Sequence, residues 1–570
     1  MKKSILLTLS VLCIACITCA QPKFAVKARK GIFSVHAYDK QGVLLHQGIG
    51  FMVGENGDLL ADFRVLKGAY KVVAVGADGK QMQADYVLGA DDTYSQVRFH
   101  VPMKTKVPYP VVTSVQPLKS TMYVLRPSDG TTIQSEQVVV EETSLIQGKY
   151  VYYGLDRQLD EKWIGSPVFN ASGALVGILH STLGTKSYVL DVRFCETLKM
   201  VAIPTNSASV ALNNIFIPKA LPATAEEALV YLYIKSRSVE NEEYMDMVNR
   251  FVASFPKNAE GYLRRATPLI DLMRFDEAAR DMEQYLSLVE DKAAGYYNVA
   301  SLIFDKLRLQ PEPAYEQWTL EVALQYVDKA LSLNAVKPAG EPQKEEYIKC
   351  QTLKAQMLME AKDYNAAIAI YDGLLQGGSG TAPAYLYAIS MAREGRGDSL
   401  SAVVEPLDSA LAVMGNPLPR DAANYVIRRG QLYANAGKYR EAVLDYNQYV
   451  YLLEGKVSAV FYYERSQIEV NARMFQQALD DINKAIELAP RTPLYHVERA
   501  VITIRVGMLD ECIESCQAAI RLNPDIIDVY RILGYAQLQK GDRENARLNI
   551  QRAIDMGDSA AQKLMETYFQ

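Results

Sequence analysis

The sequence predicts a multidomain protein in which an all-β region, large enough for two small barrels, precedes an all-α repeat solenoid. Two observations lead to this prediction. In the C-terminal half, small residues recur every 34 residues, which is typical of stacked helical repeats. Between residues 24 and 205 the sequence consists of short β-branched and aromatic runs separated by Gly, Asn and Asp, a pattern that is typical of β-strands.

The 34-residue period rests on three sets of aligned small residues. They are Ser466, Ala500 and Gly534; Ala478, Cys512 and Ala546; and Ala485, Ala519 and Ala553. A small residue is needed where two helices pack closely. Pro490 and Pro524 recur at the same interval, and proline ends a helix. The period therefore predicts helix pairs that stack on one another.

This pattern resembles the tetratricopeptide repeat (TPR), in which Gly, aromatic and Ala residues precede a closing Pro. One unit carries Gly430, Tyr433, Gly437, Tyr439, Ala442 and Tyr446. The resemblance implies a TPR solenoid over residues 224–570, with about eight repeats, and it is clearest over residues 424–557. Acidic residues after Thr224, a candidate N-cap, favour a first helix that begins there.

In TPR proteins the first helices of successive repeats line a peptide-binding groove. Carried onto the clearest units, the groove positions are Asn424, Gln431, Asn435, Tyr463, Gln467, Asn471, Val501, Arg505, Arg531 and Tyr535. Amides, aromatics and arginines suit an extended peptide, whose backbone needs donors and acceptors. The alternative is that these are ordinary solvated helix faces, because every solenoid has a concave side.

Seven runs in the N-terminal region read as strands. They are residues 31–38, 48–53, 71–75, 122–125, 138–141, 149–153 and 174–180. Three segments, residues 48–69, 78–97 and 163–178, resemble in order the parts of trypsin-like serine peptidases of the HtrA kind that carry the histidine, the aspartate and the nucleophile. The resemblance implies a trypsin-like double barrel over residues 24–205, followed by a linker over residues 206–223.

The catalytic side chains of that family are absent from the matching positions. The histidine position is Arg64, the aspartate position is Ser95 and the nucleophile position is Ile164. A protonated guanidinium cannot act as a general base, and isoleucine has no nucleophilic atom. The region is therefore interpreted as a pseudoprotease. An alternative is a relocated peptidase site near Ser166, with His180 or His100 as its base.

Residues 1–20 read as a secretory signal, with Lys2 and Lys3 before an apolar stretch and the small residues Thr18-Cys19-Ala20 before a cut. A lipoprotein is the alternative, although neither Cys16 nor Cys19 has a Leu-like residue three positions earlier. Removing the two lysines changes the formal charge from −5 to −7, which gives no electrostatic reason to expect nucleic acid. We expect a periplasmic or envelope-associated protein without membrane insertion.

The functional prediction is an exported, non-catalytic adaptor that binds a protein or peptide of the cell envelope through the TPR groove. The degenerate barrel is a second surface for a partner, or a cap on the solenoid. The alternatives are an active serine peptidase with a site near Ser166 and a periplasmic holding chaperone. No residue pattern calls for a cofactor or a metal. Cys512 and Cys516, four apart with no nearby His, are expected to pack as small apolar residues.

Overall fold

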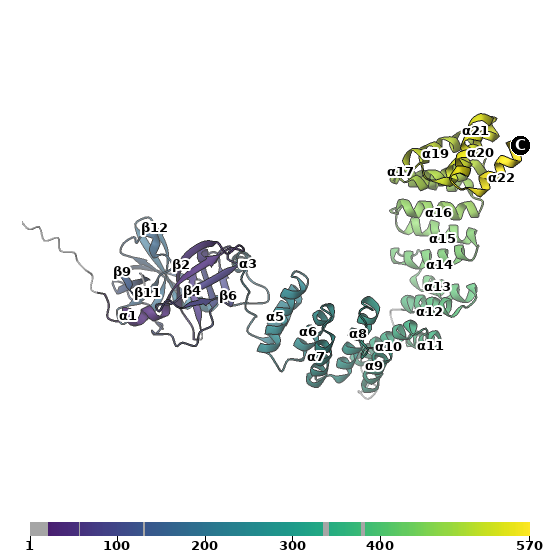
Figure 1. Ribbon diagram of the computed structural model, residues 1–570. Coiled ribbons are helices and arrows are strands. Elements are labelled where there is room, and N and C mark those ends of the chain that lie inside the picture. The colour runs from purple at the N-terminus through teal and green to yellow at the C-terminus, as the bar shows by residue number, and fades with distance from the viewer. Residues whose placement is uncertain (1–20, 56, 129–131, 335–340, 378–381, 570) are drawn as a thin grey trace, which may run out of the picture. The chain divides into compact units, whose positions relative to one another are not determined.

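The computed structural model describes residues 21–569 apart from residues 56, 129–131, 335–340 and 378–381 (Figure 1). The predicted signal at residues 1–20 lies outside this described part. The chain forms two compact units, one that ends at Glu290 and one that begins at Asp291. The first unit contains the β region and the first helices, and the second contains the rest of the helical array.

The N-terminal β region contains two sheets. The first has the strand order β5-β4-β1-β2-β3-β7-β6. Its strands are β1 (Ile32–Tyr38), β2 (Leu44–Met52), β3 (Asp58–Asp62), β4 (Lys71–Val75), β5 (Gln81–Gln83), β6 (Tyr86–Asp91) and β7 (Gln96–His100). The second sheet is a closed barrel with the order β10-β13-β12-β11-β8-β9. Its strands are β8 (Thr121–Pro127), β9 (Ile133–Ile146), β10 (Tyr150–Leu155), β11 (Pro167–Asn170), β12 (Leu175–Leu183) and β13 (Lys186–Asp191).

The first sheet differs from the closed barrel that the sequence predicts, because it stays open between β5 and β6. A later segment occupies the edge of β6 instead. The Val87 amide donates to Pro218 O at 2.8 Å, and the Ala220 amide donates to Val87 O at 2.7 Å. Lys219 thereby forms a parallel bridge with Val87. This covered edge has no free hydrogen-bonding groups left for β5 at that point.

The open sheet shares one hydrophobic core with the first helices. Three helices follow the β region: α3 (Asn206–Asn213), α4 (Ala225–Lys235) and α5 (Asn241–Ser254). Leu232 of α4 and Phe251 of α5 are fully buried in the same core as Val87 of β6 and Val97 of β7. The connection is packed as well, since Ile215 and Ile217 belong to that core. The β region and the start of the helical array therefore stabilise each other.

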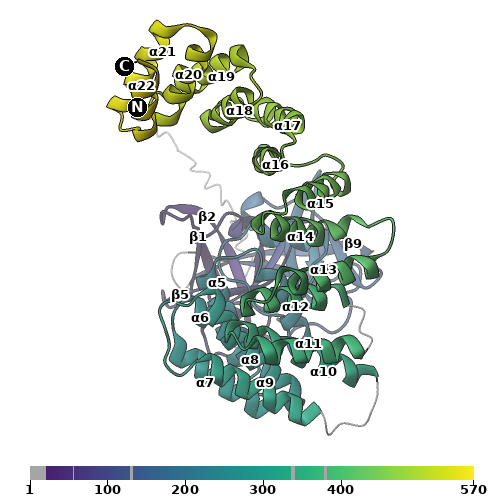
Figure 2. The same ribbon diagram turned by 90° about the vertical axis from the view of Figure 1, so that its right-hand side faces the viewer.

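From α6 onward the described helices pair in chain order and are followed by one last helix (Figure 2). The pairs are α6 (Ala259–Asp271) with α7 (Phe275–Leu288), α8 (Lys292–Leu309) with α9 (Leu320–Asn334), α10 (Glu341–Glu360) with α11 (Tyr364–Gln376), α12 (Ala382–Arg396) with α13 (Leu400–Met414), α14 (Ala423–Asn435) with α15 (Tyr439–Leu452), α16 (Ala459–Asn471) with α17 (Phe475–Leu488), α18 (Pro493–Arg505) with α19 (Leu509–Leu522), and α20 (Ile527–Lys540) with α21 (Arg543–Asp555). The last helix is α22 (Ser559–Phe569).

The residues that define the 34-residue period lie where the helices of a pair meet. All nine are buried, including Ser466 and Ala500, which are fully inaccessible. A side-chain carbon added at Gly534 would lie 2.7 Å from Cγ1 of Ile550 on the partner helix. Only glycine allows this approach. The predicted all-α repeat solenoid is confirmed.

Candidate functional site

The three positions that the sequence resemblance matched to a catalytic triad lie around a buried carboxylate, Asp62, that sequence reasoning did not single out. Asp62 ends β3 and caps the short helix α2 (Phe63–Leu66), where its Oδ1 accepts the Arg64 amide at 2.9 Å. The Arg64 side chain folds back on the same carboxylate, with Nε donating to Oδ1 and Nη2 donating to Oδ2, both at 2.8 Å. The hydrogen bond to Asp62 raises the pKa of Arg64, so this side chain stays a cation.

Ser95 completes the shell around Asp62. Its hydroxyl donates to Asp62 Oδ1 at 3.0 Å, and its carbonyl accepts the Phe63 amide at 2.9 Å. Ser95 has a φ of 47°, in the left-handed region, which turns the chain sharply between β6 and β7. The structure thus brings Arg64 and Ser95 together, 31 positions apart in sequence, with Asp62 between them.

The third position, Ile164, lies in the loop that joins the 3-10 helix Glu161–Trp163 to β11, and this loop faces the cluster. Gly165, which follows it, adopts a φ of 84°, and a side-chain carbon added there would lie 3.5 Å from Cβ of Asp62. The loop is held by the Gly165 amide, which donates to Leu179 O at 2.8 Å. All three predicted positions therefore meet at one place, where the ends of β3, the β6–β7 turn and this loop converge.

The Ser166 hydroxyl, the nucleophile of the alternative prediction, is fully buried. Its Oγ has no hydrogen-bond partner among the described residues. The His180 ring is engaged elsewhere, because its Nδ1 lies 2.7 Å from the Tyr152 hydroxyl. Burial lowers the pKa of His180, which favours the neutral ring. His100 lies on β7 opposite Tyr86, so neither ring is placed as a partner of Ser166 by a hydrogen bond that the structure describes.

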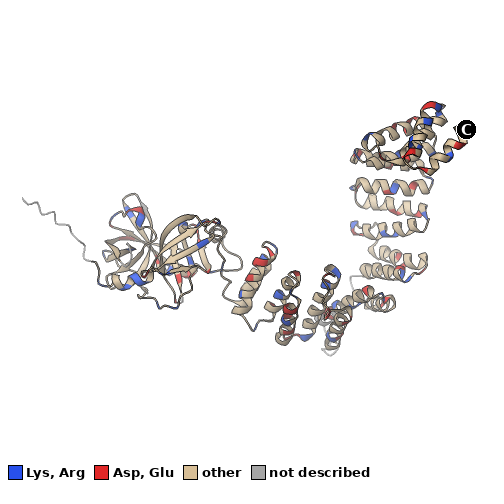
Figure 3. Cartoon of the chain, viewed as in Figure 1, with Lys and Arg blue, Asp and Glu red and all other residues tan. Residues whose placement is uncertain are grey.

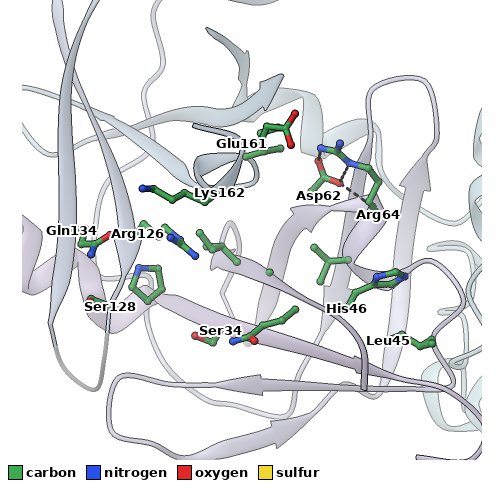
Figure 4. A pocket seen from close by; sticks show the side chains of 16 residues that line it. Ser34, Leu45, His46, Asp62, Arg64, Arg126, Ser128, Gln134, Glu161 and Lys162 are labelled. Atoms are coloured by element: carbon green, nitrogen blue, oxygen red, sulfur yellow. Dashed lines mark hydrogen bonds and ion pairs between the residues drawn. The ribbon is translucent and has the colours of Figure 1, made fainter. Parts of the chain in front are cut away.

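A cleft of about 780 Å³ opens beside Asp62 and Arg64 (Figure 4). Both sheets contribute to its walls. The first sheet provides residues of β1, β2 and α2, and the second provides residues of β8, β9 and the loop before Ile164. Its charged side chains are Asp62, Arg64, Arg126, Glu161 and Lys162. The cleft is therefore polar, unlike a pocket for an apolar substrate side chain.

The Asp-x-Arg arrangement at Asp62 occurs a second time in the β region. Asp191 ends β13, accepts the Arg193 amide at 2.9 Å and receives the Arg193 side chain on the same carboxylate. Both arginines thus satisfy the aspartate that caps the turn after a strand. Since the same local motif forms away from the cleft, Arg64 has a structural role that does not depend on a ligand.

The groove positions predicted from the sequence divide into two groups. Exposed side chains are Asn424, Gln431, Asn435, Asn471 and Arg505. Half-buried side chains are Tyr463, Gln467, Val501, Arg531 and Tyr535. In the second group, the Gln467 amide donates to the Tyr463 hydroxyl at 2.8 Å and reaches Glu498 on the next first helix at 3.4 Å. The first helices α16 and α18 are therefore linked by a hydrogen bond on this face.

Three of these positions line one pocket at the C-terminal end of the array. Arg505, Arg531 and Tyr535 surround a cavity of about 390 Å³ together with Ile504, Ile532 and Leu564. Arg531 is already paired, with its Nε 2.6 Å from Asp558 and its Nη2 2.7 Å from Asp528. Arg505 has no ion pair with any residue that the structure describes. Of the two arginines, Arg505 is the one left available to a ligand.

Charges elsewhere in the helical array are mixed, with Lys and Arg interspersed with Asp and Glu (Figure 3). The described residues contain no group of three or more His, Cys, Asp or Glu side chains arranged to hold a metal ion. In the described part of the chain, no helix combines the length and the apolar character needed to cross a membrane.

Comparison with known proteins finds relatives of the helical region. Hsc70-interacting protein 1 of Drosophila melanogaster is 32% identical over 82 residues, which are 14% of this chain and 22% of that protein. Human tetratricopeptide repeat protein 13 is 25% identical over 183 residues, 32% of this chain and 21% of that protein. A DnaJ protein homologue of Arabidopsis thaliana is 21% identical over 343 residues, 59% of this chain and 63% of that protein. The chain thus spans less than two thirds of the length of each of these relatives. No family model matches the sequence.

Among solved structures, the HtrA-type protease AlgW with a tripeptide matches 31% of this chain and 62% of its own, at 14% identity and a TM-score of 0.27. A protease of M. tuberculosis matches 35% of this chain and 85% of its own, at 13% identity and a TM-score of 0.26. The chain thus has tetratricopeptide-repeat proteins among its relatives and HtrA-type proteases among its structural neighbours.

Proposed function

We propose that this chain is an exported, non-catalytic adaptor that holds a protein or peptide of the cell envelope in the groove of its TPR solenoid. The observation that carries the proposal is the row of exposed polar side chains on the first helices α14, α16 and α18. Their apolar neighbours, such as Val426 and Ile502, are buried inside the array, so the polar side chains face outward.

The groove amides are available to a ligand. Asn424, Gln431, Asn435 and Asn471 are exposed and form no side-chain hydrogen bond with the described residues. A carboxamide has both donors and an acceptor, so a row of them can pair with the N–H and C=O groups of an extended chain. Arg505 adds a cation that can pair with an acidic residue of the partner.

The absence of peptidase activity is part of the proposal. It is supported by the engagement of Arg64 and Ser95 with Asp62, and by the burial of Ser166. The test is incubation of the purified chain with a fluorophosphonate probe and with denatured casein. We expect neither labelling nor cleavage. Labelling that disappears in Ser166→Ala would establish the peptidase alternative and refute the adaptor.

The groove assignment is tested by the double variant Asn471→Ala/Arg505→Ala in capture of partners from an envelope extract. Its matched control is Gln477→Ala/Arg521→Ala, which removes exposed side chains of the same types from the second helices of the same two repeats. We expect the groove variant to lose capture and the control to keep it, with equal helicity by circular dichroism. Equal capture by both variants would contradict the groove assignment.

A second candidate function is the holding of unfolded chains. It is favoured by the presence of an Hsc70-interacting protein and a DnaJ homologue among the relatives. The two candidates differ in breadth, since a holding chaperone recovers many unrelated proteins from the extract and an adaptor recovers few. Mass spectrometry of the captured proteins distinguishes the two candidate functions. Proteins that the groove variant also captures are subtracted as background.

Export is tested separately, because it depends on residues 1–20 alone. We expect the protein from the envelope fraction to begin at Gln21, as N-terminal sequencing would report. A retained Met1 would contradict cleavage, and an N-terminal lipid-modified Cys16 or Cys19 would establish the lipoprotein alternative.

A further inference from the structure

The cleft beside Asp62 contains a cation, Arg126, that pairs with none of the residues that the structure describes. Arg126, on β8, lies opposite Gln134 of β9, and the two side chains emerge from directly paired positions into the cleft (Figure 4). Paired residues of an antiparallel ladder lie about 5 Å apart at Cβ, so a guanidinium and an amide are presented together. Within the described residues, Arg126 forms no ion pair or side-chain hydrogen bond.

Lys162 extends this cationic wall. It belongs to the 3-10 helix Glu161–Trp163, whose backbone is anchored by the buried Trp163 ring. The Lys162 ammonium lies 2.8 Å from Asp160, but the two side chains are 53% and 71% exposed. Such exposed ion pairs contribute little to stability, so Lys162 can exchange Asp160 for another carboxylate.

Arg64 places a third cation on the opposite wall. A guanidinium has five N–H donors, and two of those of Arg64 are bonded to Asp62, so three remain. Its side chain is 59% exposed. The Asp62 carboxylate, by contrast, is only 6% exposed and accepts bonds from Arg64 and Ser95. Of the two carboxylates among the described residues that line the cleft, only Glu161 is therefore open to solvent.

The cleft also exposes an unpaired strand edge. Residues 44–49 of β2 pair with β1, whereas β3 joins β2 only from Gly50 onward. Of the strands that the structure describes, β1 is thus the one that pairs with this part of β2. Residues 45–49 line the cleft. A free edge offers backbone N–H and C=O groups to an extended chain, which a small free anion cannot use.

We propose that this cleft binds an extended acidic segment of another polypeptide. Its backbone lies along residues 44–49 of β2, and its carboxylates pair with Arg126 and Lys162 on one wall and with Arg64 on the other. This site is separate from the TPR groove, so the chain has two places for polypeptide partners. The segment is recognised by charge and by extended conformation, without cleavage.

The test is fluorescence anisotropy on the full chain with a labelled octapeptide of alternating Glu and Ser, compared with its Gln and Ser counterpart. We expect the Glu peptide to bind at least about tenfold more tightly, and salt to weaken it. Arg126→Gln/Lys162→Gln should reduce its affinity by about tenfold. The matched control Lys104→Gln/Lys149→Gln removes two exposed lysines outside the cleft and should leave affinity unchanged.

Three results would overturn the proposal: equal binding of the two peptides, equal loss in the cleft and control variants, or full displacement by citrate at the same carboxylate concentration. The last result would assign the site to a free anion. The groove variant Asn471→Ala/Arg505→Ala should bind the Glu peptide as wild type does. Loss of binding in that variant would place the peptide in the solenoid and refute the cleft assignment.

Discussion

Arg465 and Asp481, 16 residues apart, form a bidentate ion pair that joins the two helices of one repeat. Arg465 Nε lies 2.6 Å from Oδ2, and Nη2 lies 2.7 Å from Oδ1. The same spacing and geometry occur between Arg265 and Asp281 and between Arg429 and Asp445. A recurring ion pair therefore fastens the first helix to the second in three of the described helix pairs.

Removing one partner of this pair should destabilise the solenoid. Arg465 is 11% exposed and Asp481 is 9% exposed, so Arg465→Ala leaves a carboxylate that is poorly hydrated. We expect a loss of about 3–5 kcal/mol in the free energy of unfolding. Chemical denaturation followed by helical circular dichroism measures it. Arg274→Ala, in an exposed pair with Glu277, is the control and should lower the free energy of unfolding far less. Equal effects would contradict the structural role of the buried pair.

Glu469 should make the stability of the same repeat depend on pH. Burial and the nearby Asp481 carboxylate raise the pKa of Glu469 from 4.5 to about 8. Because the folded state holds this proton more tightly than the unfolded state, its contribution is full below pH 4.5 and is lost as the pH rises to about 8. Glu469→Gln removes the ionisation.

The expected result is that Glu469→Gln is more stable than wild type at pH 9, on the order of 2–4 kcal/mol, at about 1.4 kcal/mol per pKa unit. The difference should shrink toward pH 5. Glu464→Gln, on the exposed face of α16, is the control and should not change the pH profile. Parallel stability curves for wild type and Glu469→Gln between pH 5 and 9 would show that the pKa is not raised.

Two substitutions of helical glycines should change the stability of the protein in opposite directions. Gly534→Val pushes a side chain into Ile550 and toward the Ala546 carbonyl, 3.0 Å from an added Cβ, and should cost about 1–3 kcal/mol. Gly373→Ala on α11 meets no atom within 4 Å and should stabilise by about 0.5–1 kcal/mol, because alanine loses less backbone entropy. Thermal unfolding measures both changes. Destabilisation by Gly373→Ala would contradict the open space at that position.

Because α5 and the open sheet share one core, a substitution that destabilises α5 should also destabilise the strands of that sheet. Phe251→Ala should cost about 3–5 kcal/mol and should speed hydrogen exchange in β6 and β7 as well as in α5. Val230→Ala, on an exposed part of α4, is the control and should leave exchange in the strands unchanged. Faster exchange confined to α5 would show that the two parts unfold independently.

Much of this architecture follows from local sequence signals. The strand over residues 71–75 is predicted from its run of β-branched residues. The buried small residues of the repeats are predicted from their regular spacing, because helix packing requires them at fixed positions. The open first sheet could not be predicted, since it depends on residues 218–220 pairing with β6, a contact across about 130 positions of chain. β3 and β7 are not among the runs that the sequence predicts as strands.

The residues around the candidate site could be predicted from the sequence, but the carboxylate between them could not. Arg64, Ser95 and Ile164 were found through a resemblance, but Asp62 looks like any aspartate at the end of a strand. Its role depends on burial and on Ser95, which is distant in sequence. The Arg465–Asp481 pair did leave a signal, because an arginine precedes an aspartate by 16 residues in three helix pairs. Arginine and aspartate are charged, however, and the 34-residue period was found from small residues alone, so the alignment does not include this pair.

Site-specific photo-crosslinking shows whether the TPR groove holds a polypeptide partner. A benzophenone amino acid replaces Asn471 on the first helix α16, and in a matched variant it replaces Leu444, a 69% exposed residue on the second helix α15. After irradiation in an envelope extract, we expect a discrete crosslinked protein from position 471 and none from position 444. Crosslinks of equal yield from both positions, or none from position 471, would contradict it.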